Sequence, residues 1–87
     1  MSDLDRTYGA LSDDARRRIL AALREDQPLS TNEIARLFPT SRWAVMKHLA
    51  VLRGAGLVQT MPQGRRRLHF LAPRRLDEAR AWLEDLA

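Results

Sequence analysis

The stretch LSTNEIARLFPTSRWAVMKHLAVLRGAGLV, residues 29–58, contains the signals that begin and end two consecutive helices. The first signal is the pair Ser30 and Glu33, whose spacing is that of a capping box. The helix that it opens is expected to run to about Phe38, because Pro39 has no amide hydrogen with which to continue it. The first half of the stretch therefore predicts a helix of roughly eight residues.

The second half of the stretch predicts a longer helix. Ser41 is a favourable N-cap, and Gly54 and Gly56 supply the C-terminal stop. One side of this helix carries a buried stripe, formed by Val45, Leu49 and Leu52. Helices of roughly 8 and 13 residues joined by a turn of about three residues have the geometry of a helix-turn-helix.

The opposite side of the second helix is unusual for a surface that faces water. It carries Trp43, Met46, Lys47 and Ala50, so two large apolar side chains accompany a lysine. A solvated helix face is normally polar. This face is therefore the first candidate for a binding surface.

Two helices are predicted before this stretch. A short leading helix over residues 2–10 is expected to break near Gly9, and Ser12 is the expected N-cap of the helix that follows. The buried stripe of that following helix consists of Ala15, Ile19, Ala22 and Leu23.

After the stretch come two short strands and a last helix. The strands are expected to flank a turn over residues 62–64, with Leu68 and Phe70 on one face of the second strand and Arg67 and His69 on the other. Pro73 is expected in the first turn of the closing helix. This order of elements predicts a mainly α winged helix-turn-helix with a small β-hairpin, as one domain over residues 1–87.

Positive charge is concentrated in one part of the chain. Residues 1–35 carry five Arg against seven acids and residues 76–87 one Arg against four, whereas residues 36–75 carry eight Arg and one Lys without any acid. The overall net charge of +4 conceals this block. A contiguous basic block is typical of a surface that meets phosphates, although a solvated basic face without a partner is the alternative.

The chain resembles the ArsR-type (arsenical-repressor-like) bacterial transcriptional repressors. Four runs carry the likeness: ALSDDARRRILAAL (10–23), LSTNEIARLF (29–38), SRWAVMKHLAVLRGAGLV (41–58) and GRRRLHFLAP (64–73). Relatives in that family are homodimers that pair through their first and last helices. They place the second helix of the helix-turn-helix in the major groove and the wing near the minor groove.

The resemblance implies positions for both surfaces. The implied DNA-reading residues on the second helix are Ser41, Arg42, Trp43, Met46 and Lys47, and the implied wing contacts are Arg65, Arg66 and Arg67. The implied dimer seam consists of Leu4, Tyr8, Leu11, Leu76, Ala79, Trp82, Leu83 and Leu86. Metal-sensing members have Cys-x-Cys near the positions of residues 30–32, or His and acidic ligands on the closing helix. This chain has neither pattern, so no metal and no cofactor are expected.

Several residues keep two interpretations. Trp43 either contacts DNA or packs inside the helix-turn-helix near Phe38 and Pro39. The run Arg65–Arg67 either meets a groove or phosphates, or is a soluble hairpin tip. His69 either meets a phosphate or is a neutral surface residue, and His48, beside the buried stripe, is expected to be structural.

The apolar arc of the closing helix either completes the core of one chain or forms the dimer seam. Trp82 favours the seam, because a side chain this large near the end of a short chain has few neighbours left to cover it.

Other classes of function lack the necessary residues. The chain has no cysteine, and its adjacent acids would diverge on their helices, so no catalytic site is expected. No run is long enough to span a membrane, which predicts a cytoplasmic protein.

The sequence thus predicts a sequence-specific DNA-binding regulator, a homodimeric repressor that binds an inverted-repeat operator through the helix near 41–53 and the wing near 57–71. An activator or architectural factor is an alternative within the same class. The alternative from another class is a protein-interaction module with Trp43 and Met46 as its hot spot. No small-molecule inducer can be inferred.

Overall fold

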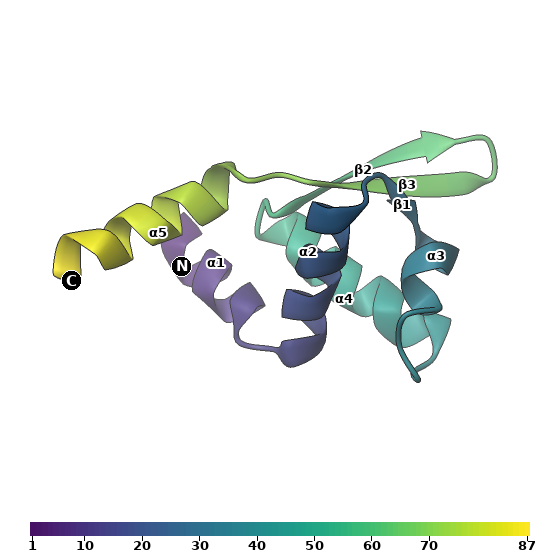
Figure 1. Cartoon of the computed structure of the whole chain (residues 1–87), viewed down its shortest axis with the longest axis horizontal. Helices are drawn as coiled ribbons and strands as arrows, with labels where there is room; N and C mark the ends of the chain where they lie inside the picture. The colour runs from purple at the N-terminus through teal and green to yellow at the C-terminus, as the bar shows by residue number, and fades with distance from the viewer.

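The computed structural model describes all residues from 1 to 87 and is mainly helical. Its elements, in chain order, are α1 (Asp3–Leu11), α2 (Asp14–Glu25), β1 (Leu29–Ser30), α3 (Thr31–Ala35), α4 (Arg42–Gly54), β2 (Val58–Gln63), β3 (Arg66–Leu71) and α5 (Arg74–Leu86). The molecule is elongated, with extents of 43 × 25 × 24 Å. Helices α1 and α5 lie at one end of the long axis and the β2–β3 hairpin extends to the other (Figure 1). The predicted winged helix-turn-helix is confirmed.

The predicted starts of α3 and α4 are confirmed. Ser30 Oγ accepts a hydrogen bond from the Glu33 amide at 3.1 Å, and Glu33 Oε1 accepts one from the Ser30 amide at 2.9 Å. Ser41 Oγ accepts one from the Ala44 amide at 3.1 Å. The predicted end of α3 is wrong, because the helix ends at Ala35 rather than Phe38.

The connection from α3 to α4 is consequently longer than predicted. The Leu37 and Phe38 amides bond to carbonyls three residues earlier, at 2.9 and 3.3 Å, so the chain tightens into turns before Pro39. Residues 36–41 therefore join the two helices.

Two boundaries near the N-terminus differ from prediction. Gly9 lies inside α1, since a single glycine costs a helix only about 1 kcal/mol. Ser12 closes α1, where its amide bonds to the Gly9 carbonyl at 3.2 Å, and Asp13 is the N-cap of α2. Ser and Asp are about equally good N-caps, so local chemistry did not separate them.

The hairpin belongs to a three-stranded antiparallel sheet of order β1-β3-β2, whereas the sequence predicted two strands. Strand β2 continues to Gln63, which pairs with Arg66, so the turn consists of Gly64 and Arg65 rather than residues 62–64. Gly64 has φ +60°, a value suited to glycine. β1 pairs with β3 and fastens the start of α3 to the wing.

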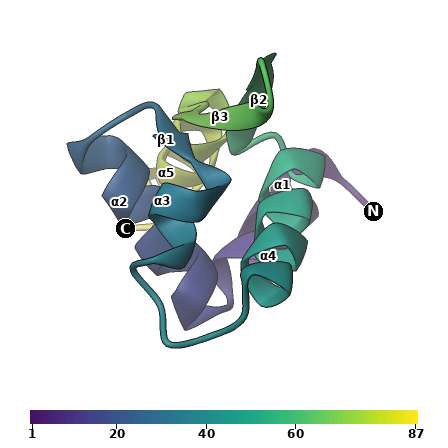
Figure 2. The same cartoon turned by 90° about the vertical axis from the view of Figure 1, so that its right-hand side faces the viewer.

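The core lies beneath this sheet, between α2, α3 and α4 (Figure 2). The predicted stripe of α4 is buried as expected, and so are Ile19 and Leu23 of α2. Ala15 and Ala22 are only half-buried, and Leu20 joins the core instead. With its inner side covered in this way, α4 presents its other face outward.

Candidate nucleic-acid interface

The outward face of α4 begins at the first turn of the helix. Ser41, Arg42 and Lys47 are exposed, and Met46 is close to half exposed. The side chain of Trp43 is 66% exposed, so the hypothesis that it packs inside the helix-turn-helix is wrong. Its ring instead lies 4.5 Å from Lys47 Nζ, a cation–π distance.

Phe38, in the turn before α4, is partly buried. It packs against the core and carries the Arg18 guanidinium 5.0 Å above its ring. The turn before α4 is thus closed without the tryptophan. The large aromatic ring of Trp43 remains on the surface.

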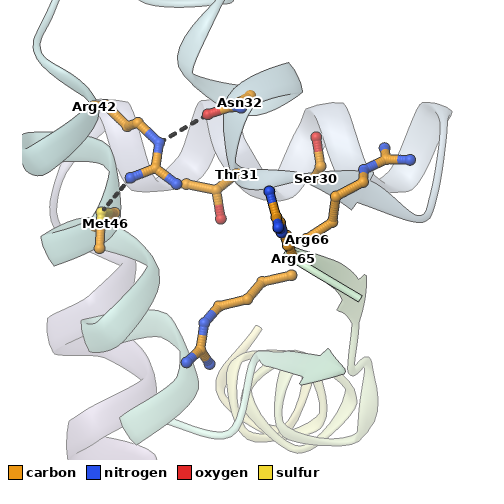
Figure 3. A pocket seen from close by; sticks show the side chains of 8 residues that line it. Ser30, Thr31, Asn32, Arg42, Met46, Arg65 and Arg66 are labelled. Atoms are coloured by element: carbon orange, nitrogen blue, oxygen red, sulfur yellow. Dashed lines mark hydrogen bonds between the residues drawn. The ribbon is translucent and has the colours of Figure 1, made fainter. Parts of the chain in front are cut away.

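Arg42 is held by two side chains of the helix-turn-helix (Figure 3). Its Nε donates to Asn32 Oδ1 at 2.8 Å, and its Nη1 donates to Met46 Sδ at 3.2 Å. Asn32 belongs to α3 and Met46 lies one turn further along α4. The side chain is therefore oriented before any partner arrives.

The wing arginines are all exposed, and one of them is tied to α3. Arg66 Nη2 donates to Glu33 Oε1 at 3.2 Å, so the capping-box carboxylate also holds the hairpin. Hydrogen bonds from the Ser30 backbone and side chain, followed by the charge of Arg66, lower the pKa of Glu33. Glu33 is therefore ionised at neutral pH.

The α4 face and the wing meet at one hollow of about 130 Å³ between α3, α4 and the hairpin (Figure 3). Its lining residues are Ser30, Thr31, Asn32, Arg42, Met46, Arg65, Arg66 and Arg67. Four arginines and no acid line it. The structure thus brings together Arg42, Met46 and the three wing arginines, while Ser41, Trp43 and Lys47 lie outside the hollow.

His69 does not lie on an exposed basic face, and both interpretations of it as a surface residue are wrong. Its side chain is 1% exposed. Thr31 Oγ1 lies 2.8 Å from its Nε2, and Thr60 Oγ1 lies 2.8 Å from its Nδ1. Burial, and then the charges of Arg53 and Arg67, lower the pKa of His69 to about 4, so the ring is neutral at pH 7.

The predicted grouping of residues on the two faces of β3 is confirmed, but the face with His69 is not the exposed one. The face with His69 and Leu71 turns toward the core, whereas Leu68 and Phe70 are half-buried and lie outside the core cluster. Strand alternation predicted which residues share a face, but not which face is covered. His48 is half-buried on α4, next to the buried stripe.

The residues of the implied dimer seam lie on α1 and α5, which pack together at the end of the molecule opposite the wing (Figure 1). Tyr8 Oη donates to the Ala79 carbonyl at 2.8 Å, and the Tyr8 and Trp82 rings meet edge to face at 6.2 Å. Ala79 is 4% exposed, so it is already covered within one chain.

The other residues of the implied dimer seam are partly covered within one chain and partly exposed. Leu11 and Leu76 pack against the core and Leu4 is half-buried. Trp82, Leu83 and Leu86 remain as exposed apolar side chains. The arc on α5 therefore completes the core at its inner end and leaves an apolar surface at its outer end.

Sequence reasoning missed the residues that hold the candidate site in place. Asn32 and Glu33 orient Arg42 and Arg66, and Thr31 and Thr60 hold His69. Glu33 had a local signal as part of the capping box, but its second bond depends on the folding of the hairpin back onto α3.

Comparisons with known proteins agree with this geometry. A helix-turn-helix domain family matches residues 11–60. The HTH-type transcriptional regulator Rv2034 of Mycobacterium tuberculosis is 44% identical over 80 residues, which cover 92% of this chain and 74% of that protein.

Solved structures are also similar. The crystal structure of an ArsR family transcriptional regulator is 30% identical, with a TM-score of 0.90 and coverage of 97% of this chain and 86% of that one. The homodimeric winged helix-turn-helix DNA-binding domain of Mb0332 from Mycobacterium bovis shares the fold at 21% identity, with a TM-score of 0.78 and coverage of 97% and 77%.

These relatives are transcriptional regulators, which supports the expectation of a regulatory rather than an enzymatic role. No helix of the structure combines the length and apolar character needed to cross a membrane. The fold, the exposed α4 face, the arginine-rich wing and the relatives agree: the chain belongs to the ArsR family of winged helix-turn-helix transcriptional regulators.

Proposed function

We propose that this regulator binds double-stranded DNA sequence-specifically as a homodimer and represses transcription by occupying a promoter. The observation that carries the proposal is the shared hollow, where Arg42 and Met46 of α4 face Arg65–Arg67 of the wing without an intervening acid. A helix and a wing that meet at a basic hollow suit a DNA strand that runs between two grooves.

The exposed face of α4 has the chemistry needed in a major groove. Arg42 offers a fork of N–H donors that fits guanine O6 and N7, and Met46 offers an apolar surface for a thymine methyl group. Lys47 supplies a positive charge for a phosphate. Trp43, with Lys47 above its ring, presents a large exposed surface beside these groups.

The homodimer is supported by the apolar end of α5 and by the homodimeric Mb0332 domain. Trp82, Leu83 and Leu86 lie at the opposite end of the long axis from the wing, so a second copy can cover them without blocking the basic hollow. A two-fold axis there would direct two α4 helices to successive major grooves. The operator is then an imperfect inverted repeat with half-sites about 10 base pairs apart or slightly more.

A gel shift against the promoter of the protein's own gene tests DNA binding. Arg42→Ala and Lys47→Ala are expected to weaken binding, whereas Arg80→Ala serves as the charge-matched control. Arg80 lies on α5, where its guanidinium is paired with Asp77 and Glu84 at 3.3 and 3.7 Å. Binding that is equally strong in all three variants would instead favour a protein-interaction module built on Trp43 and Met46.

The dimer is tested by sedimentation of the wild type and of Trp82→Ala. The substitution is expected to shift the protein toward the monomer, since it removes a large exposed ring from the seam. An unchanged dimer would place the seam elsewhere. A reporter gene driven by the bound promoter separates repression, which lowers transcription, from activation or a purely architectural role.

A further inference from the structure

Arg42 is oriented by two neutral side chains, unlike the arginines that pair with a carboxylate. Six arginines form ion pairs with carboxylates: Arg6, Arg17, Arg66, Arg74, Arg75 and Arg80. Arg42 bonds instead to the amide oxygen of Asn32 and the thioether sulfur of Met46, which are both neutral. Its side chain is therefore oriented while its charge remains uncompensated.

The two bonds leave the donors that matter for recognition free. A guanidinium has five N–H groups, of which Asn32 engages the one on Nε and Met46 engages one on Nη1. Three N–H groups, one on Nη1 and two on Nη2, remain free to donate. Arginine N–H groups of this kind pair with the O6 and N7 acceptors of guanine.

The charge of Arg42 has no compensating partner on its own helix. Arg42 is the first residue of α4, whose first turn contains no acid, and a cation at that end is disfavoured by the helix dipole. The Asn32 amide, on the preceding helix of the motif, supplies the shorter of the two bonds at 2.8 Å. It restricts a side chain that would otherwise lose considerable rotamer freedom on binding.

We propose that Asn32 is a positioning residue for base recognition: it orients the Arg42 fork for a guanine in the operator and does not itself touch DNA. The inference rests on the proposed DNA-binding function. It predicts that Asn32 affects the discrimination between sequences rather than general attraction to DNA, because removing a neutral amide leaves the charge of the interface unchanged.

The probes are a duplex selected on the wild-type protein from a random-sequence pool and a scrambled duplex of equal length. Asn32→Ala is expected to weaken binding to the selected duplex about three- to tenfold. Binding to the scrambled duplex and the dependence of affinity on salt should both stay within about twofold of the wild type, since no phosphate contact is lost.

Two further variants separate positioning from other roles. In an Arg42→Ala background, Asn32→Ala is expected to cause no additional loss of affinity for the selected duplex. Asn32→Asp keeps the acceptor for Arg42 Nε but adds a negative charge, so it should weaken both duplexes alike and preserve the ratio between them.

Three results would overturn the proposal. The first is an equal loss of affinity for both duplexes with Asn32→Ala. The second is a further loss of affinity when Asn32→Ala is added to Arg42→Ala. The third is a change, with Asn32→Asp, in the ratio of the affinities for the two duplexes. The first would indicate a structural role and the second a direct DNA contact by Asn32. If the wild type selects no duplex at all, the proposed DNA-binding function itself fails, which is a distinct outcome.

Discussion

Acidification is expected to destabilise this protein through His69. The ring lies buried between Thr31 and Thr60, and its pKa is lowered from 6.5 to about 4 in the folded state. Between these two pKa values the His69 ring is protonated in the unfolded chain and neutral in the folded chain. The contribution of neutral His69 to the free energy of unfolding is fully present above about pH 6.5. It declines as the pH falls toward the folded pKa of about 4.

The magnitude follows from the difference between the two pKa values. One pKa unit corresponds to about 1.4 kcal/mol, so the full loss below the folded pKa is about 3 kcal/mol. At about pH 5 the unfolded ring is almost fully protonated and the folded ring mostly neutral, which gives a loss of about 2 kcal/mol relative to about pH 7.5. For a chain of 87 residues this is a substantial part of the total stability.

Urea unfolding at the two pH values measures the effect, at one protein concentration because dimerisation adds to apparent stability. His69→Gln is the control, since its amide bonds to a threonine but does not titrate. Asp13 and Glu33 also have lowered pKa values, but their stabilising effect is lost as the pH falls from their ordinary values of 3.8 and 4.5 through the lower values of the folded state. A His69→Gln variant that loses as much stability as the wild type would refute the reasoning, as would an NMR titration of His69 with a midpoint near 6.5.

Three further predictions concern the surface and one helix end. If the dimer neutralises about eight phosphates, log affinity for DNA should fall with log salt at a slope near −7, and a slope shallower than about −3 would contradict the basic block as the binding surface. In a Trp82→Phe background, the emission of the exposed Trp43 should change when the selected duplex is added, and an unchanged spectrum would argue against its contact with DNA. Gly56→Ala should lower stability by about 1–2 kcal/mol in thermal unfolding. Gly56 has φ +76°, and an added Cβ would lie 3.2 Å from Arg75 Cγ. Gly54→Ala is its control, because the added Cβ would meet nothing within 4 Å beyond its own turn of helix.

Local sequence signals predicted the elements that carry the site. The serine caps of α3 and α4 and the buried stripe of α4 are as expected, because caps and helical periodicity act between residues close in sequence. The same locality explains the errors at Gly9 and Ser12, where competing local choices differ by little free energy.

Part of the candidate nucleic-acid interface was predicted from the sequence. The exposed side of α4 and the wing arginines follow from the pattern and from the family resemblance, and the structure adds that Arg42 and Met46 share a hollow with the wing. The position of Trp43 was left open, because a large residue early in a helix can either pack against the preceding helix or stay exposed. The structure leaves its side chain 66% exposed, while Phe38 packs against the core.

The sequence by itself determined the order of the helices, the hairpin and the position of the basic block, because these depend on backbone preferences and charge along the chain. Only the tertiary structure decided the bonds from Asn32 to Arg42, from Glu33 to Arg66 and from Thr31 to His69. These join residues 10, 33 and 38 positions apart. The first pair forms when α3 packs against α4, and the other two form when β1 draws the start of α3 against β3. The physical reason is that a side chain bonds to whichever group lies near it once the elements have packed. Local propensities act between residues close in sequence and do not specify such a neighbour.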